Sequence, residues 1–270
     1  MELKDKVIII TGASSGIGEA LAYEFAAKDC KIVIASRNIK KLLEVESRIR
    51  KTCTNALSVK ADVSIETDCV NIINMAVQKY GTVDVLINNA GVSMRALFEK
   101  LDLKVIKQLM DINFWGTVYC TKYALPYLLQ NKGSVVGVSS IAGFKGLPGR
   151  TGYSASKFAM HGFLEALRIE NLKKDLHVMI ACPGYTESNI RNTALTKDGS
   201  MQGESPLEER KLMTSEEVAR RIVKGVECRK HRLVMTSQGK MAVLLNKFFP
   251  KMTDRMVFNT ISKEPDSPFR

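Results

Sequence analysis

Residues 6–18, KVIIITGASSGIG, place a short β-branched run directly before a glycine-rich turn and the start of a helix. An unbroken apolar run of this length is typical of a buried parallel strand. Gly12 permits a tight turn, Gly16 removes side-chain bulk, and Gly18 lets the helix pack closely on the sheet. The free N–H groups at the N-terminus of such a helix attract phosphate groups. We therefore expect this segment to bind the pyrophosphate of a dinucleotide.

Strand-like and helix-like runs alternate through the rest of the chain. Beside the first strand, the runs that predict strands are residues 31–36, 56–63, 83–91, 133–140, 177–184 and 231–236. The runs that predict helices are residues 16–29, 39–52, 66–80, 98–130, the segment around Tyr153, and 214–226, which opens with the capping pair Thr214 and Glu217. The alternation predicts an α/β fold, a Rossmann-type doubly wound parallel sheet with helices on both faces. Ligands of such a sheet bind at the carboxyl ends of its strands.

The composition is that of an ordinary globular protein, with 270 residues of which 45% are hydrophobic and 25% charged. No stretch is typical of an interdomain linker, so we expect residues 1–230 to form a dinucleotide-binding and catalytic domain. Residues 231–270 would add a last strand and a basic amphipathic extension to it. The N-terminus enters a strand directly, no apolar run is long enough to span a membrane, and the six cysteines form no metal-binding pair. These features predict a cytoplasmic protein without a signal peptide, a disulfide framework or a bound metal.

The basic charge is concentrated near the C-terminus. The formal net charge is +12, and residues 220–270 hold twelve Lys and Arg against four Asp and Glu. A basic surface can attract nucleic acid, anionic lipid or a phosphorylated cofactor. The sequence contains none of the recognition motifs of nucleic-acid-binding proteins, so we expect no nucleic-acid partner.

The end of the second predicted strand indicates which dinucleotide is bound. Enzymes that prefer NAD usually carry an acidic residue there, which holds the ribose 2′-hydroxyl. This chain has Ser36 and Arg37 instead. A guanidinium can bind a 2′-phosphate through two charge-assisted hydrogen bonds, so we expect NADP(H). The alternative is that Arg37 is an ordinary solvated surface residue.

Tyr153 and Lys157 stand four residues apart in TGYSASKFAMHG, residues 151–162. On a helix these two positions share one face. A nearby ammonium group favours the phenolate and lowers the pKa of a tyrosine, which is ordinarily near 10. The pair could then pass a proton at neutral pH. The alternative is a solvated helix face on which the two residues meet by chance.

Short segments of this chain form an ordered set of motifs. They are TGASSGIG at Thr11–Gly18, the pair Asp62 and Val63, NNAG at Asn88–Gly91, the set Asn113, Ser140, Tyr153 and Lys157, and PG at Pro183 and Gly184. With these motifs, the chain from Lys6 to about Gly225 resembles the classical short-chain dehydrogenase/reductase family. In that family the catalytic serine lies thirteen positions before the tyrosine, which selects Ser140 over Ser139.

The resemblance implies a role for each member of the catalytic set. Tyr153 would donate a proton to a substrate carbonyl as hydride arrives from the nicotinamide, and Ser140 would hydrogen-bond the carbonyl oxygen. Lys157 would hold the nicotinamide ribose and lower the pKa of Tyr153. Asn113 would hold a water molecule that connects Lys157 to solvent. We expect Ser139 to be structural and His161, two turns further along the helix, to be a packing residue.

The resemblance also implies the residues that contact the cofactor. They are Gly12, Ser14, Ser15, Gly16, Ile17, Gly18, Ser36, Arg37, Asp62, Val63, Asn89, Ala90, Gly91, Tyr153, Lys157, Pro183, Gly184, Thr186 and Ser188. The family often has a threonine five residues after the proline of the PG motif. This chain has Ser188 there and Thr186 two residues earlier, so both hydroxyls stay candidates for the nicotinamide carboxamide.

The long polar segment of residues 189–213 is predicted to cover the substrate as a lid. The residues expected near the pocket are Val92, Ser93, Met94, Phe144, Leu147 and Tyr185. Because this wall is mostly apolar, a hydrophobic ketone, aldehyde or alcohol fits better than a sugar or an acid.

Residues 239–260 combine a basic stripe with an apolar face on a helical wheel. The stripe is Lys240, Lys247, Lys251 and Arg255, and the face is Met241, Leu245, Phe248, Phe249, Met252 and Met256. Either this segment lies on a membrane surface, or it packs on its own protein or on a second subunit. Pro250 would kink the helix or divide it into two. Family relatives usually form dimers or tetramers, so we expect a homo-oligomer.

Together these features predict an NADP(H)-dependent oxidoreductase that interconverts a carbonyl and an alcohol on an apolar, lipid-, steroid- or retinoid-like substrate, with Tyr153 as general acid/base. Two other hypotheses stay open. One is a dinucleotide-binding sensor with weak catalysis, and the other is a peripheral membrane protein that uses the fold as a scaffold.

Overall fold

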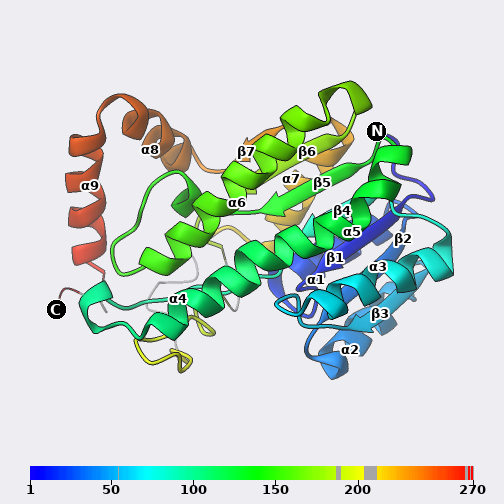
Figure 1. Cartoon of the computed structure of the whole chain (residues 1–270), viewed down its shortest axis with the longest axis horizontal. Helices are drawn as coiled ribbons and strands as arrows, with labels where there is room; N and C mark the ends of the chain where they lie inside the picture. The colour runs from blue at the N-terminus through cyan, green and yellow to red at the C-terminus, as the bar shows by residue number, and fades with distance from the viewer. Residues whose placement is uncertain (54, 187–189, 204–211, 265–266, 268, 270) are drawn as a thin grey trace.

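The computed structural model describes residues 1–53, 55–186, 190–203, 212–264, 267 and 269. Its centre is one sheet of parallel strands in the order β3-β2-β1-β4-β5-β6-β7 (Figure 1). The strands are β1 Val7–Thr11, β2 Lys31–Ser36, β3 Ala56–Lys60, β4 Val85–Asn88, β5 Ser134–Val138, β6 His177–Cys182 and β7 Arg232–Val234. The strand order reverses between β1 and β4, which is where a doubly wound sheet opens a crevice for ligands. The predicted fold class is confirmed.

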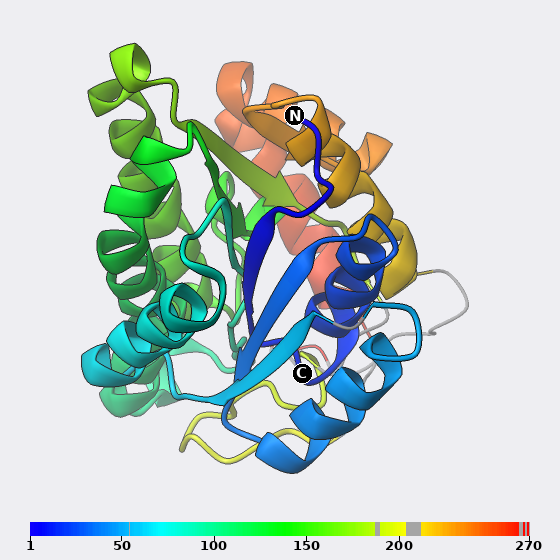
Figure 2. The same cartoon turned by 90° about the vertical axis from the view of Figure 1, so that its right-hand side faces the viewer.

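Helices cover both faces of the sheet. The α-helices are α1 Gly16–Ala26, α2 Ile39–Ile49, α3 Glu66–Tyr80, α4 Leu103–Leu109, α5 Gly116–Gln130, α6 Thr151–Glu170, α7 Ser215–Glu227, α8 Ser237–Phe248 and α9 Pro250–Ser262. Figure 2 shows the sheet between α3, α5 and α6 on one side and α1, α2 and α7 on the other. Successive strand side chains point to opposite faces. In β1, Ile9 therefore joins the core under α3, α5 and α6, while Ile8 and Ile10 join the core under α1, α2 and α7.

The start of α7 follows the predicted capping pattern. The hydroxyl of Thr214 accepts a hydrogen bond from the backbone N–H of Glu217 at 3.1 Å. In a complete capping box the glutamate returns to the N-cap backbone. Here the Glu217 carboxylate pairs instead with Arg221, one turn further along α7. Of the two halves of the motif, the described residues therefore show the threonine half.

The single helix predicted over residues 98–130 is wrong in detail. The structure has a 3₁₀ turn at Phe98–Lys100, then α4, then a π-helical segment at Met110–Trp115 that leads into α5. A π segment contains an extra residue and changes the direction of the side chains around it. Here it turns Asn113 inward, and Gly116 follows so close to Val63 that a Cβ would lie 2.8 Å from Val63 Cγ2.

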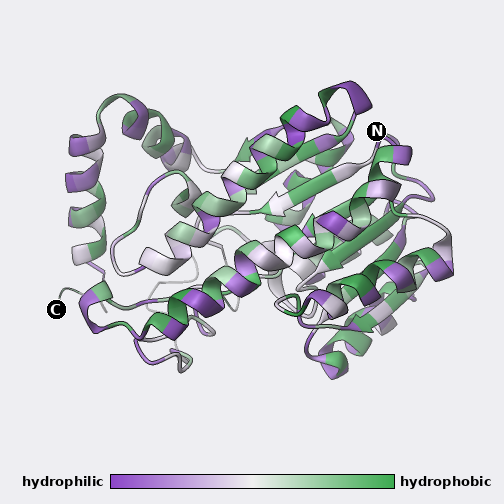
Figure 3. Ribbon diagram, viewed as in Figure 1, coloured by the Kyte–Doolittle hydropathy of each residue, from purple (hydrophilic) through white to green (hydrophobic). Residues whose placement is uncertain are grey.

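The C-terminal segment forms two helices rather than one. α8 ends at Phe248 and α9 begins at Pro250, which occupies the first turn, where its missing N–H is not needed. The expectation that Pro250 can divide the helix is confirmed, so the single continuous wheel is wrong. Both helices project from the end of the sheet where α4 begins (Figure 1), and both mix polar and apolar residues along their length (Figure 3). Within the described ranges, none of the helices has the length and apolarity needed to cross a bilayer.

Candidate active site

Hydrogen bonds join the glycine-rich turn after β1 to the NNAG segment after β4. The hydroxyl of Thr11 accepts hydrogen bonds from the backbone N–H groups of Asn89 and Ala90, each at 3.1 Å. The Asn89 side chain donates to the carbonyls of Thr11 at 2.9 Å and Gly12 at 3.1 Å. Gly12 has φ +66°, and a Cβ there would lie 2.7 Å from Ala90 Cα. The two segments therefore form one rigid floor at the carboxyl ends of neighbouring strands.

The N-terminus of α1 rises from this floor. Ser15 is the N-cap residue, and within the described part of the chain its side chain caps no N–H of the helix. The neighbouring Ser14, Gly16 and Ile17 surround the same helix end. A Cβ on Gly18 would lie 2.4 Å from the Gly12 carbonyl oxygen, so only glycine allows this approach of helix and turn. A helix N-terminus beside a small-residue turn fits the pyrophosphate of a dinucleotide.

Ser36 and Arg37 lie at the carboxyl end of β2, beside the Asp62–Val63 pair that follows β3. The Arg37 guanidinium is 58% exposed and lies 3.8 Å from an Asp62 carboxylate oxygen. The other carboxylate oxygen of Asp62 accepts from the Ser64 N–H and hydroxyl. Val63 is buried against Gly116. The long Arg37–Asp62 contact leaves the guanidinium accessible to a ligand.

Tyr153, Lys157 and Ser140 come together although they belong to two elements. Tyr153 and Lys157 are both buried on one face of α6. The Lys157 ammonium donates to the Val138 carbonyl at 3.0 Å and lies 5.8 Å from the centre of the Tyr153 ring. Ser140 follows β5, and its hydroxyl accepts from the Ala142 N–H at 3.2 Å. The Ser140 side chain lies near enough to the Tyr153 hydroxyl to act against a rise in the pKa of that phenol.

Burial determines the protonation of this cluster. Burial raises the pKa of Tyr153, and the neighbouring Ser140 side chain acts against this rise. Burial also lowers the pKa of Lys157 to about 8. The expectation that Lys157 lowers the Tyr153 pKa does not hold in this structure. The reason is that desolvation dominates at the phenol, and the ammonium is directed at the Val138 carbonyl.

Asn113 is fully buried and is held by the neighbouring backbone. Its side-chain oxygen accepts from the Val92 N–H at 2.8 Å. Its amide group donates to the Val92 carbonyl and to the Ser156 hydroxyl, each at 2.9 Å. Ser156 in turn donates to the Tyr153 carbonyl at 2.8 Å. Sequence reasoning missed Ser156, although its place between Tyr153 and Lys157 on one helix could have drawn attention to it.

Ser139 and His161 form a separate buried pair behind the site. The Ser139 hydroxyl and His161 Nε2 are 2.7 Å apart. The His161 ring packs against the Phe144 ring with a centroid separation of 4.5 Å. Burial lowers the pKa of His161 to about 4, so the imidazole is neutral at physiological pH. The expectation of a structural serine and a packing histidine is confirmed.

The expected substrate wall is assembled from three loops. Val92, Ser93 and Met94 are buried in the loop after β4, where the Ser93 carbonyl accepts from the Leu195 N–H of the predicted lid at 2.9 Å. Phe144 and Leu147 follow β5 and pack on the core that contains Tyr153. Tyr185 follows β6 and is exposed. The loops after β4 and β5 therefore both lie against the core that contains Tyr153, and the loop after β4 also contacts the predicted lid.

The PG motif lies at the base of the third loop. A Cβ on Gly184 would lie 2.4 Å from Thr236 Cγ2, so Pro183–Gly184 packs directly on the chain that enters α8. Thr186 is buried, and its hydroxyl donates to the Gly184 carbonyl at 3.1 Å. Ser188, the other candidate hydroxyl, lies outside the described residues.

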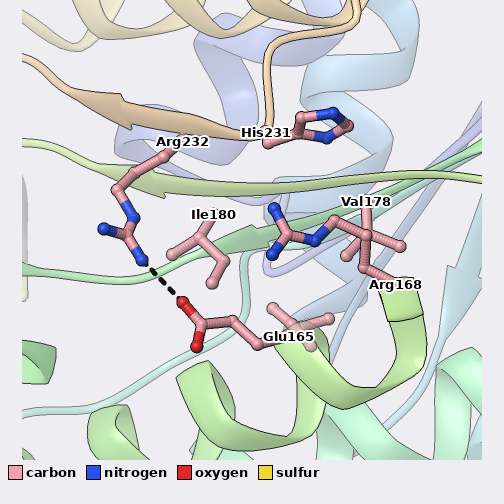
Figure 4. Close-up of a pocket in the computed structure, with 7 residues that line it drawn as sticks. Glu165, Arg168, Val178, Ile180, His231 and Arg232 are labelled. Atoms are coloured by element: carbon pink, nitrogen blue, oxygen red, sulfur yellow. Dashed lines mark hydrogen bonds and ion pairs between the residues drawn. The ribbon is translucent and has the colours of Figure 1, made fainter. Parts of the chain in front are cut away.

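A hollow of about 290 Å³ lies elsewhere, between α6 and the last strands of the sheet (Figure 4). Its lining includes an ion pair between Glu165 and Arg232, whose charged atoms are 2.6 Å apart, with Arg168 nearby. None of the predicted catalytic or cofactor residues lines it. The predicted site at the strand ends is therefore separate from this hollow.

Comparison with known proteins identifies the family. Residues 6–199 match the family model described as short chain dehydrogenase. The chain belongs to this family. Its members are oxidoreductases with a nucleotide-binding fold, and this chain is therefore a short-chain dehydrogenase/reductase that acts on a small molecule. The matched range includes the glycine-rich turn, Asn113, Ser140, Tyr153 and Lys157.

Two curated relatives cover most of this short-chain dehydrogenase. 11-beta-hydroxysteroid dehydrogenase 1A of Arabidopsis thaliana is 40% identical over 245 residues, which cover 86% of this chain and 68% of the relative. Dehydrogenase/reductase SDR family protein 7-like of Dictyostelium discoideum is 33% identical over 260 residues, which cover 93% and 80%.

Solved structures of low sequence identity share the fold. A short-chain dehydrogenase/reductase from Burkholderia phymatum in complex with NAD superposes with a TM-score of 0.83 at 21% identity, covering 93% of this chain and 96% of that one. An alcohol dehydrogenase from Thermococcus sibiricus complexed with 5-hydroxy-NADP gives 0.74 at 22% identity, covering 84% and 93%. At this identity the likeness concerns the fold alone.

Proposed function

We propose that this short-chain dehydrogenase is an NADP(H)-dependent oxidoreductase that interconverts a carbonyl and an alcohol on an apolar, steroid-like substrate. The observation that carries the proposal is the buried cluster in which Tyr153 and Lys157 share one face of α6, with the Ser140 side chain near the Tyr153 hydroxyl. A buried proton donor beside a second hydroxyl suits a carbonyl oxygen that becomes negatively charged during reduction.

Each residue of the cluster has a distinct task. Bound nicotinamide supplies the hydride in reduction and accepts it in oxidation. Ser140 orients the carbonyl oxygen, and Tyr153 gives it a proton. Because burial raises the pKa of Tyr153, the phenol is protonated at neutral pH, which favours its role as the acid in carbonyl reduction. Lys157 holds the ribose hydroxyls, while Asn113 and Ser156 fix the segments on either side.

The cofactor preference rests on Arg37. The residues of the floor after β1 and β4 fit a dinucleotide, because glycine is required where a Cβ would collide with the backbone and the N–H groups of α1 face the turn. Within the described residues, the exposed guanidinium at the end of β2 has one ion-pair contact, at 3.8 Å with Asp62, and so it can engage a 2′-phosphate. Thr186 or Ser188 would contact the nicotinamide carboxamide.

The substrate class rests on the apolar wall and on the relatives. Val92 and Met94 belong to the apolar core that contains Tyr153, and Phe144 and Leu147 are partly buried against it. Several relatives, at 33–40% identity, carry the name 11-beta-hydroxysteroid dehydrogenase. A steroid-like ketone or alcohol therefore fits the site better than a charged metabolite.

The test is NADPH oxidation at neutral pH with steroid ketones, long-chain aldehydes and small apolar ketones. Tyr153→Phe should lower turnover by about 10²–10⁴-fold, the contribution of a positioned acid, without loss of NADPH binding. Tyr123→Phe is the matched control, because it removes a surface hydroxyl that is hydrogen-bonded to Glu66. If no carbonyl is turned over while NADPH still binds, a dinucleotide-binding sensor is the better description.

We also propose that α8 and α9 contact an anionic membrane surface. The side chains of Met241, Leu244, Phe248, Met252 and Met256 are exposed on these helices. Lys240, Lys247, Lys251 and Arg255 lie on the same two helices. Exposed apolar side chains beside basic ones are typical of helices that lie in a membrane interface.

Vesicle co-sedimentation tests this contact. Binding should be strong for anionic vesicles, weak for neutral ones, and reduced in a Phe248→Ser/Met252→Ser variant. No binding to either kind would leave a second subunit as the partner of this surface. Light scattering of the wild type would then test the expected homo-oligomer. The same measurement on the variant would show whether it is monomeric.

A further inference from the structure

Ser140 and Tyr153 serve the same carbonyl oxygen in the proposed chemistry, but they come from different elements. Tyr153 lies on α6, and Ser140 is the residue that opens the 3₁₀ turn Ile141–Gly143 after β5. The distance between the two hydroxyls therefore depends on how this turn is held against α6. Ser139 and His161, which the proposed chemistry leaves unused, meet at this place.

The imidazole of His161 lies directly against the 3₁₀ turn. Its Nε2 atom is 2.7 Å from the Ser139 hydroxyl, and both side chains are buried. A Cβ on Gly143 would lie 2.6 Å from the same nitrogen, so the turn contacts the ring with no space for a larger residue. The Phe144 ring meets the imidazole edge to face, with centroids 4.5 Å apart. The ring thus contacts the residues before, within and after the turn.

The position of this turn determines where the Ser140 hydroxyl lies. That hydroxyl accepts from the Ala142 N–H at 3.2 Å, and the Ser140 carbonyl accepts from the Gly143 N–H at 3.0 Å. Along extended backbone, successive side chains point in opposite directions, so Ser139 can face His161 while Ser140 faces the site. A shift of the turn relative to α6 would therefore carry the Ser140 hydroxyl with it.

Other side chains of α6 hold the chain before and after the turn. The Lys157 ammonium donates to the Val138 carbonyl at 3.0 Å, which fixes the end of β5. The Ser154 hydroxyl accepts from the Leu147 N–H at 3.1 Å, beyond the turn. Between these two points, the chain rests on His161. This histidine therefore links the helix of the proton donor to the turn of its partner hydroxyl.

The thiol of Cys182, at the end of β6, is a second neighbour of the pair. Its sulfur lies 3.9 Å from His161 Nε2 and near the Ser139 hydroxyl. A thiol is a weak donor and a weak acceptor, so it does not replace an imidazole. The 2.7 Å contact between Ser139 and His161 is the stronger link.

We propose that Ser139 and His161 are positioning residues that hold the turn carrying Ser140 at a fixed distance from Tyr153. The proposal rests on the proposed function, because it takes the Ser140 and Tyr153 hydroxyls as the groups that meet the carbonyl oxygen. A displacement of a catalytic group by about 1 Å can cost about 10²-fold in rate, so a looser turn slows the chemical step. NADPH binding is affected little, because the floor at β1 and β4 is built from other contacts.

The test is a double-mutant cycle, measured on the reduction of an 11-keto steroid by NADPH. His161→Phe keeps a ring against Gly143 and Phe144 but removes Nε2, and Ser139→Ala removes the hydroxyl. Each variant should lower kcat about tenfold, while KM and NADPH affinity change less than twofold. Because both changes break the same contact, the double variant should be no slower than the slower single variant. His161→Gln, whose amide can take the place of Nε2, should recover kcat to within about threefold of wild type.

A second buried serine–histidine pair supplies the matched control. Ser134 Oγ and His177 Nδ1 are 2.9 Å apart at the opposite end of β5 and β6, and both side chains are buried. Ser134→Ala and His177→Phe should lower the free energy of unfolding by an amount similar to that of the two site variants, but should leave kcat unchanged. Equal losses of kcat at both pairs, or additive losses within the cycle, would overturn the proposal and indicate a purely structural contact.

Hydrogen exchange separates failure of this proposal from failure of the proposed function. In His161→Phe and in Ser139→Ala, the amides of Ala142 and Gly143 should exchange at least tenfold faster, while those of β1 keep their protection. This measurement needs no substrate. Absence of turnover in wild type would contradict the proposed function alone, whereas unchanged exchange in both variants would contradict the positioning role.

Discussion

Burial shifts the pKa values of two side chains at the centre of the site in opposite directions. Desolvation favours the neutral form of each, so it raises the pKa of Tyr153 and lowers that of Lys157 to about 8. Below pH 8 Lys157 is charged in both the folded and the unfolded chain. Its burial therefore lowers the free energy of unfolding there, and this cost shrinks as pH rises from about 8 to the ordinary lysine pKa of 10.5.

Lys157→Met should accordingly stabilise the cofactor-free protein at pH 7. The gain should be about 1–3 kcal/mol, since 2.5 pKa units correspond to about 3 kcal/mol and the hydrogen bond to Val138 is lost. Urea unfolding at pH 7 and pH 10 checks the prediction, and the gain should be smaller at pH 10. The exposed Lys251→Met is the control. A variant less stable than wild type at pH 7 would contradict this view of Lys157.

The proposed preference for NADP(H) over NAD(H) can be tested at Arg37. Arg37→Asp should weaken NADPH binding by about 10- to 100-fold, the value of a charge-assisted contact, and should affect NADH far less. Fluorescence titration with both dinucleotides measures the ratio. Lys173→Asp makes the same change in net charge on an exposed turn, so it controls for a general effect of protein charge on dinucleotide binding. Equal losses for both cofactors would mean that Arg37 does not bind the 2′-phosphate.

Among the helices, the start of α7 offers the simplest test. Thr214→Ala removes the hydroxyl that accepts a hydrogen bond from the Glu217 N–H and should cost about 1 kcal/mol of unfolding free energy. Thr214→Ser keeps the hydroxyl and should cost a few tenths at most. Urea unfolding of both variants measures the difference. If alanine and serine behave alike, the threonine half of the capping box does not hold this helix.

The strands and the helix starts could be predicted because their causes are local. An apolar run such as Val7–Thr11, or a threonine before Glu217, acts on residues within a few positions. The π segment could not be predicted, because it depends on Asn113 meeting Val92 across the fold. Proline chemistry allowed Pro250 to divide the last helix, but the helices' contacts with Phe144 and Lys145 come only from the folded chain.

The candidate site was predictable to a similar degree. The residues match family motifs, so the cluster of Ser140, Tyr153 and Lys157 could be expected before its geometry was known. The direction in which the Tyr153 pKa shifts could not be predicted, because it depends on burial rather than on spacing. The contact between Ser139 and His161 could not be predicted either, because it joins two elements that only the fold brings together.

At the scale of the whole molecule, two buried histidines contribute to the loss of stability in acid. Burial lowers the pKa of His161 and of His177 to about 4, so the unfolded chain binds more protons than the folded one between pH 6.5 and 4. The contribution of these two imidazoles to stability is therefore fully present above pH 6.5 and is lost as the pH falls toward 4. The slope should reach about 1.4 kcal/mol per pH unit for each histidine.

His177→Gln should reduce this slope by about half, because one of the two imidazoles is gone. Urea unfolding at pH 7, 6 and 5 gives the slope. His231→Gln, at an exposed histidine, should leave it unchanged. An unaltered slope in His177→Gln would assign the acid sensitivity to carboxylates instead.

The order of the elements along the chain also sets an order of assembly during synthesis. A ribosome adds about 5–20 residues per second, so α9 appears roughly 10–30 s after β4. The strands β1 and β4, which carry the cofactor floor, are complete long before then. A nascent chain would thus have a floor able to receive a dinucleotide before its substrate wall exists. Binding of the cofactor would then stabilise the folded part of the incomplete chain while α8 and α9 are still being synthesised.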